Sequence, residues 1–255
     1  MPIKNRDHLF YPALAILISA TCFAGFSWTY FGPMVARSYP PAGAPLHLHG
    51  WSFFLWYLLF PLQAILVARD KYALHMALGR LSVVLVIVMT VTGILVLSVR
   101  VEEALRNGGP QIWLLYGPLF LSNLLLFVAF YAAAIRMAMT NRLQAHKRLI
   151  IVASAIVVGA GSARVLMLLS EFHPLSVPIG ILACSLFIVI GIVYDWLTVR
   201  SVHPVYWIGL VAVLGVEASL FPQLNGDTVA WINQWIGALG EHLGVFYDPE
   251  PTVEF

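Results

Sequence analysis

The sequence predicts an all-α membrane protein, built as a bundle of seven transmembrane helices. Hydrophobic residues make up 60% of the 255 residues, and charged residues only 10%. A soluble domain carries about 25% charged residues, so this chain lacks the charge needed to cover a water-facing surface. Seven apolar stretches are each long enough, at about 20 residues, to cross the hydrocarbon core of a bilayer as a helix.

The predicted spans follow one another along almost the whole chain. They cover roughly 9–30, 47–68, 77–99, 112–138, 148–169, 178–198 and 204–222. The first follows a basic lead, as in a signal peptide, but no A-x-A cleavage site comes after it, so we expect a retained helix. Prolines lie near the start of several spans, where the missing N–H costs little.

The distribution of Lys and Arg predicts the orientation of the bundle. With the N-terminus in the cytoplasm of a bacterial cell, ten of the 14 basic residues fall on the inner side: Lys4, Arg6, Arg69, Lys71, Arg80, Arg136, Arg142, Lys147, Arg148 and Arg200. Positive residues gather on the cytoplasmic side of membrane proteins. We therefore expect a multi-pass protein of the inner membrane, with its partner the lipid bilayer. No basic stripe with interleaved aromatics indicates nucleic acid.

Residues 223–255 are predicted to leave the seven-helix domain, residues 1–222. Thr228 is a plausible N-cap for a helix on the outer side. Apolar residues recur at helical spacing after it, namely Trp231, Ile232, Trp235, Ile236, Leu239 and Leu243. A helix of this kind with tryptophans should lie in the membrane interface. The acidic end, residues 248–255, is predicted to be a frayed tail.

Histidines near the predicted span ends form two layers. His75, His146 and His203 lie near the inner face, each at or just before a helix start, and Asp195 and Arg80 are expected at similar depth. A helix N-terminus disfavours the protonated ring, so these imidazoles should be neutral. Neutral imidazoles can ligate haem iron or hydrogen-bond a quinone. Alternatively, these histidines are ordinary residues of a cytoplasmic boundary.

The outer layer begins in the second span, with His49 and His47, and includes His173. His49, Ser52, Trp56 and Gln63 fall on one helical face, at offsets of 3, 7 and 14, so this polar stripe should face the bundle interior. His47 lies two residues before His49 and points about 200° away from it on a regular helix. The two rings are therefore not expected to share one site.

A charged side chain inside a membrane costs free energy, and Arg164 and Glu217 are two further residues of this kind. They are predicted at matched depth in the fifth and seventh spans, which suggests an ion pair. The pair is either structural or part of a site for an anion, a quinone or a proton beside His49 and His173. Glu171 is an alternative partner for Arg164.

Small residues of the spans are interpreted as packing residues. Gly159 and Gly161 should allow close approach of helices. The two cysteines, Cys22 and Cys184, form no CxxC pair, and we expect them to pack rather than to form a disulfide.

No HExxH, G-x-G-x-x-G, P-loop or G-x-S-x-G motif is present, so the sequence leaves open whether the protein is an enzyme. The predicted seventh span also lacks the lysine of a retinal Schiff base. No internal repeat suggests the two halves of a transporter.

The segments "HLHGW…LLFPLQ", "LHMALGR", "AHKRLI" and "YDWLTVRSVHP" resemble a widespread group of bacterial multi-pass membrane proteins. The resemblance covers about residues 47–236, and its most specific elements are LHxxLGR and HKRL. It supports the layout of the spans but implies no mechanism. The residues that it singles out are His75, Gly79, Arg80, His146, Lys147, Arg148, Asp195 and His203. A looser similarity to b-type membrane cytochromes implies two haems, each held by a pair of histidines near one membrane face.

Three functions fit these observations. The first is a redox protein that binds haem b or interacts with a quinone, using the two histidine layers. The second is a structural or assembly subunit of a larger membrane complex. The third is a transporter of protons or small solutes, with Arg164, Glu217, Asn123 and Gln63 along a polar path. We favour the first.

Overall fold

The computed structural model describes residues 3–173 and 175–247 and is helical throughout its regular elements. The helices are α1 (Ile3–Phe26), α2 (Gly32–Val35), α3 (Ala44–Ala68), α4 (Tyr72–Asn107), α5 (Ile112–Met139), α6 (Leu143–Val157), α7 (Gly159–Leu169), α8 (Ser176–Leu182), α9 (Ser185–Val199), α10 (Pro204–Leu220) and α11 (Pro222–Leu243). A π-helical turn, Ser27–Phe31, joins α1 to α2, and a 3₁₀ turn, Gly244–Phe246, follows α11. The predicted tail, 248–255, lies outside the described residues.

Five helical segments of the described chain are long and apolar enough to cross a membrane, or up to seven if each of two bent helix pairs is one span. These five are Arg6–Val35, Ala44–Ala68, Tyr72–Asn107, Ile112–Met139 and Ser176–Val199. The bent pairs are α6 with α7, and α10 with α11. The prediction of an all-α, multi-pass membrane protein is confirmed at this level.

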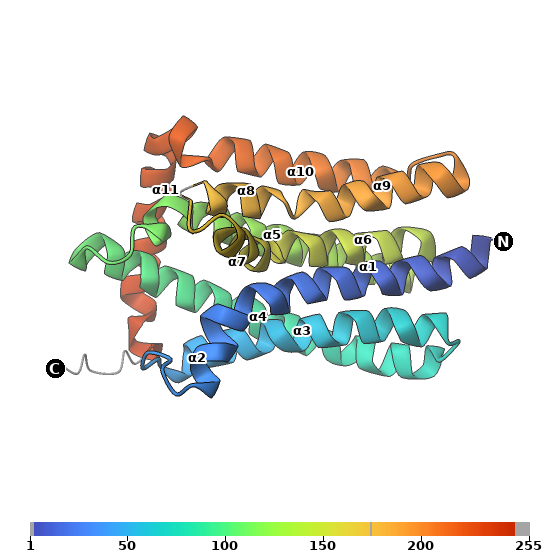
Figure 1. The fold of residues 1–255 in the computed structure, drawn as a ribbon, viewed down its shortest axis with the longest axis horizontal. Helices are drawn as coiled ribbons and strands as arrows, with labels where there is room; N and C mark the ends of the chain where they lie inside the picture. The colour runs from blue at the N-terminus through green and yellow to red at the C-terminus, as the bar shows by residue number, and fades with distance from the viewer. Residues whose placement is uncertain (1–2, 174, 248–255) are drawn as a thin grey trace.

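The long helices run roughly along one axis, and α11 crosses them at one end (Figure 1). The axes of α10 and the later part of α11 differ by 89°. We call the end at which α1 begins the α1 end, and the opposite one the α11 end. At the α11 end, α4 continues well past the predicted 77–99. Its 36 residues span about 54 Å, which exceeds the thickness of a bilayer core.

The predicted start of the last helix at Thr228 is wrong. α11 begins at Pro222, and its only non-helical residue is Asn225, so Thr228 lies inside the helix. The predicted apolar face also divides in two. Ile232 and Ile236 pack against α4 and α5, whereas Trp231 and Trp235 are exposed. The helix is therefore held to the bundle by one side and presents its tryptophans on another.

The predicted fifth span is bent by 47° after Val157, where α6 gives way to α7. The bend lets α7 lie against α1. Gly161 of α7 approaches the backbone of α1 so closely that a Cβ on Gly161 would lie 2.8 Å from the Cys22 Cα. Gly25, about one turn after Cys22 on α1, also faces Gly161. The predicted packing role of Gly161 is confirmed. Gly159 makes only ordinary contacts, with Ile181 of α8.

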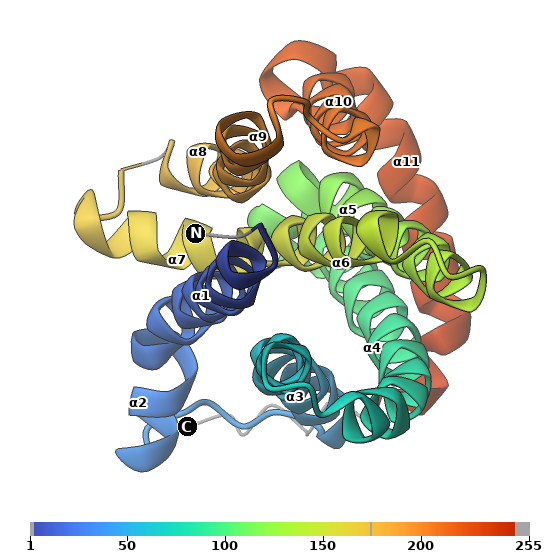
Figure 2. The same ribbon diagram turned by 90° about the vertical axis from the view of Figure 1, so that its right-hand side faces the viewer.

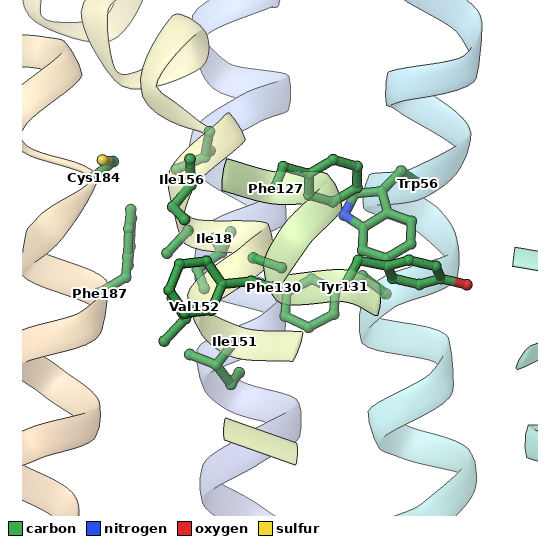
Figure 3. Packing of buried hydrophobic residues seen from close by; sticks show 14 of the residues in the cluster. Ile18, Trp56, Phe127, Phe130, Tyr131, Ile151, Val152, Ile156, Cys184 and Phe187 are labelled. Carbon is green, nitrogen blue, oxygen red and sulfur yellow. The ribbon is translucent and has the colours of Figure 1, made fainter. Parts of the chain in front are cut away.

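The main hydrophobic core draws buried residues from α1, α3, α4, α5, α6, α9 and α10. Trp56 of α3 lies beside Phe127 and Tyr131 of α5, with Ile151 of α6 farther along the cluster (Figure 3). Cys184, the residue before α9, lies at the α9 edge of this cluster. Both cysteines are buried and free, which agrees with the packing role predicted for them.

Candidate functional site: a cavity at the α1 end

A cavity of about 830 Å³ opens at the α1 end between α1, α3, α4, α5 and α6. Figure 2 shows these helices end-on as neighbours in the bundle, and residues from all five line the cavity. Its surface is mostly apolar, as in sites that bind small organic molecules. Five of the predicted site residues line it: His75, His146, Gln63, Trp56 and Arg80.

The two inner-layer histidines of the cavity lie next to each other. The ring centroids of His75 and His146 are 6.4 Å apart, with the rings nearly perpendicular. His146 Nδ1 lies 2.9 Å from the carbonyl oxygen of Ala134 on α5. Because a carbonyl only accepts, Nδ1 must carry a proton, so in a neutral His146 ring the lone pair is on Nε2. His146 is therefore oriented and held in one tautomer.

Several polar atoms of the cavity walls are buried without a hydrogen-bond partner among the described residues. They are Nδ1 of His75, Oε1 of Gln63 and Nε1 of Trp56. The backbone of Gln63 lies beside the His75 ring. Buried polar groups normally have partners, so unpartnered atoms at a cavity wall indicate groups that a ligand or water satisfies.

The polar groups near Trp56 form a short chain. Ser82 Oγ lies 2.6 Å from the Gly79 carbonyl and 2.7 Å from the Tyr131 hydroxyl. Ser82 donates to the carbonyl, so it accepts from Tyr131. This arrangement uses the single hydroxyl proton of Tyr131 inside the protein and leaves its oxygen able to accept from a ligand.

The cavity opens sideways between α4 and the α5–α6 hairpin. Cavity residues on both sides of this opening are exposed, among them Met76 and Val83 of α4, Met139 at the end of α5 and Leu143, the first residue of α6. Apolar residues exposed at the side of a membrane protein face lipid. The exposed apolar residues at this opening are therefore placed to contact lipid.

The consecutive residues His146, Lys147 and Arg148 project toward three different neighbours, because successive residues on a helix are about 100° apart. His146 faces α5 and the cavity. Lys147 pairs with Asp7 of α1 at 2.6 Å, and Asp7 also accepts from the Tyr194 hydroxyl. Arg148 makes two bonds to Asp195 of α9, at 2.9 and 2.6 Å. The sequence HKR thus ties α6 to three other helices.

Asp195 and Arg80, which we expected at similar depth near the inner histidines, lie at two different places in the structure. Asp195 is fully buried and used by Arg148 and by the backbone N–H of His203. Arg80 lies instead at the cavity, where no ion pair joins it to a described acidic residue. The reason is that α9 and α10 lie on the far side of α6 from the cavity.

His203 is the inner-layer histidine that does not line the cavity. It is the N-cap of α10, and its Nδ1 accepts from the backbone N–H of Val205 at 3.2 Å. Burial lowers the pKa of His203, as do Arg148 and, less strongly, Lys147, whereas Asp195 opposes them. The ring is therefore a neutral cap, in agreement with the protonation state that its position at a helix start predicts.

We expect this cap to make stability depend on pH. The pKa of His203 is lower in the folded state, so its stabilising effect is present above the unfolded value of about 6.5 and is lost as pH falls through the folded value. The stability lost in this way is no larger than the contribution of one N-cap, about 1 kcal/mol. The His203→Asn variant caps without titrating. Its melting temperature in detergent should fall less than that of the wild type between about pH 7.5 and about pH 5, and equal falls would contradict the prediction.

The outer-layer residues are not brought together as the sequence suggested. His47 binds the Tyr30 hydroxyl through Nδ1 at 3.0 Å. His49 packs against Phe53. His173 is exposed, and its Nδ1 accepts from the Leu175 backbone N–H. No contact among the described residues joins His49 to His173.

The predicted ion pair between Arg164 and Glu217 is absent from the described residues. Arg164 donates to the carbonyl of Ala160 and lies over the Phe26 ring, 4.3 Å from its centroid. Glu217 lies at a different cavity, lined by α5, α8 and α10. The bend between α6 and α7 directs Arg164 toward α1 and away from α10. Matched depth alone did not determine which helix faces meet.

Sequence reasoning missed Tyr131 and Ser82 as site residues and Arg148 as the partner of Asp195. Ser82 comes seven residues after His75, which places both on one face of α4, so helical periodicity could have found it. Arg148 could have been found because a buried aspartate near the membrane needs a cation. Tyr131 carries no such signal, since tyrosines are common near span ends.

No group of three or more His, Cys, Asp or Glu within the described chain is arranged to hold a metal ion. Comparisons with known protein families, with curated proteins and with solved structures find no match to this chain. The cavity at the α1 end is therefore the feature from which function is inferred.

Proposed function

We propose that this protein is a redox membrane protein whose cavity at the α1 end binds a quinone. The observation that carries the proposal is the convergence of neutral hydrogen-bonding side chains, from α3, α4 and α6, on an apolar cavity that is open to lipid. A quinone has the matching composition: a flat ring with two carbonyl oxygens and an apolar tail. When bound, it would supply two-electron, two-proton chemistry between ring carbonyls and hydroxyls.

The cavity residues have distinct roles in this proposal. The Nε1–H of Trp56 donates to a ring carbonyl of the oxidised form. The lone pair of His146 Nε2 accepts from a ring hydroxyl of the reduced form, since Ala134 holds the proton on Nδ1. Lys147 and Asp7, which line the same cavity, connect it to the end of the bundle. The apolar walls and the lateral opening accommodate the tail.

The number of membrane crossings and the orientation of the bundle are part of the same proposal. α1 begins at one end of the bundle and α11 lies at the other, as an odd number of crossings requires (Figure 1). We infer seven crossings, with the α1 end in the cytoplasm of a bacterial inner membrane, from the Lys and Arg distribution. The quinone site then lies near the cytoplasmic face of the membrane.

The test is binding of a short-chain ubiquinone, and of its quinol form without oxygen, to purified protein in nanodiscs, measured by calorimetry. We expect His146→Ala to weaken quinol binding about tenfold, since it removes the acceptor of a hydrogen bond from the quinol hydroxyl in a buried site. His173→Ala is the matched control, because His173 is exposed and outside the cavity, and it should bind as the wild type does. Equal quinol affinity of the wild type and His146→Ala, or no binding at all, would contradict the quinone proposal.

The histidine pair also favours a second candidate, one haem b in the same cavity. The ring centroids of His75 and His146 are 6.4 Å apart, so the two imidazoles would be the residues that hold the iron of one haem, which would supply one-electron chemistry. His146 has the second hydrogen bond typical of a metal-ligating histidine. An absorption spectrum of the purified protein distinguishes the candidates: a Soret band that His75→Ala and His146→Ala each abolish supports haem.

A further inference from the structure

A second cavity, of about 500 Å³, lies at the α11 end between α5, α8, α10 and the start of α11. It is separate from the quinone site and is lined by different residues. Its walls are aliphatic and aromatic, from Leu119, Pro178, Leu182, Leu214 and Phe221, with Glu217 as the one charged side chain of the lining. The volume lies in the range of small-molecule sites, about 300–1,000 Å³.

Glu217 is buried, with 7% of its surface exposed, and its Oε1 has no hydrogen-bond partner among the described residues. No described Lys, Arg or His forms an ion pair with it; the ion pairs of the described chain involve other residues. Arg164, its predicted partner, faces Phe26 of α1. The neighbouring titratable group is the thiol of Cys184, which carries no positive charge.

An unpaired carboxylate in apolar surroundings is costly, and a cation brought next to it interacts far more strongly than in water. The cavity beside Glu217 has room for such a cation and walls that suit an apolar body. No positive residue of the lining repels it. From this combination we propose that the cavity at the α11 end binds a lipophilic organic cation, with Glu217 as its counter-ion.

The access route agrees with this ligand class. Leu175, Ile179 and Leu224 line the cavity and are 46%, 50% and 73% exposed. Leu175 precedes α8, and Leu224 lies at the kink that begins α11, so the mouth is at the α11 end, beside the helix that presents Trp231 and Trp235. Amphipathic cations concentrate at the membrane interface, which is where this mouth opens.

The experiment compares tetraphenylphosphonium with tetraphenylborate, two ions of nearly the same shape and opposite charge. Binding to the protein in nanodiscs is measured by equilibrium dialysis, with empty nanodiscs as background. We expect the wild type to bind the cation at least about tenfold more tightly than the anion. Glu217→Gln should weaken cation binding by about tenfold or more while leaving short-chain ubiquinone binding unchanged.

The matched control is Glu241→Gln, which removes a negative charge at the same end of the bundle. Glu241 is on α11 and is paired with Arg106 at the surface. The Glu241→Gln variant should bind the cation as the wild type does. Equal cation affinity of Glu217→Gln and the wild type overturns the proposal. If Glu217→Gln does not fold, the wild type alone decides: equal binding of the two ions also overturns it. Because the ubiquinone assay reports on the other cavity, failure here is separate from failure of the quinone proposal.

Discussion

Replacing Arg148 with alanine is expected to lower the free energy of unfolding by about 3–5 kcal/mol, the cost of leaving one buried charge unpaired. The side chains of Arg148 and Asp195 are only 6% and 1% exposed. Two of the guanidinium nitrogens bind both carboxylate oxygens, and the third binds Gln144. Without the guanidinium, Asp195 keeps only the backbone N–H of His203 as a partner.

Lys147→Ala is the matched control, since Lys147 is the next residue on α6 and pairs with Asp7. The side chains of Lys147 and Asp7 are 23% and 22% exposed. Accessible ion pairs typically contribute about 0.2–1 kcal/mol, so we expect Lys147→Ala to lower the free energy of unfolding by about 1 kcal/mol. Thermal unfolding in detergent measures both. The double variant Arg148→Met with Asp195→Leu should recover much of the loss, because apolar replacement of a buried pair is often neutral. Equal losses for Arg148→Ala and Lys147→Ala would show that burial of the pair does not matter.

A side chain at Gly25 is expected to separate α1 from α7, at a cost of about 3 kcal/mol, the upper range for overpacking. A Cβ at Gly25 would overlap the carbonyl oxygen of Gly161, which is backbone and so cannot rotate away. Gly25→Val should therefore lower the melting temperature strongly, although valine suits a membrane helix by its hydrophobicity.

Gly215→Ala on α10 is the control for this substitution. A Cβ at Gly215 meets nothing within 4 Å among the described residues. The Gly215→Ala variant should be as stable as the wild type, or more stable by up to about 1 kcal/mol, which is the difference in helix propensity between glycine and alanine. Thermal unfolding under the same conditions compares the two variants. A mild Gly25→Val effect, similar to that of Gly215→Ala, would mean that the contact between α1 and α7 can relax.

Periodicity predicted the orientation of single helices well. The stripe of Ser52, Trp56 and Gln63 on α3 does face inward: Ser52 and Trp56 are buried, and Trp56 and Gln63 line the cavity. His47 and His49 do have different neighbours. These features follow from the 100° step of a helix, which needs no knowledge of other helices.

Pairs of residues on different helices were predicted less well. Arg164 and Glu217 were matched by depth and predicted to form an ion pair, yet Arg164 lies over Phe26 of α1; depth also did not predict that Asp195 pairs with Arg148. Depth is one coordinate of a residue in a bundle; the other is which neighbour its helix faces. That second coordinate depends on helix order around the bundle and on bends such as the 47° one between α6 and α7.

The sequence by itself determined that the chain is a helical membrane protein and which face of each long helix is polar, because hydrophobicity and helical periodicity are local properties. Only the tertiary structure decided that His75 and His146 share one cavity while His203 caps a helix, that HKR reaches three helices, and that Glu217 lies unpaired in a second cavity. In lipid there is little hydrophobic preference between helix neighbours, so close contacts such as Gly25 with Gly161 select them, and such contacts form only when the whole bundle is assembled.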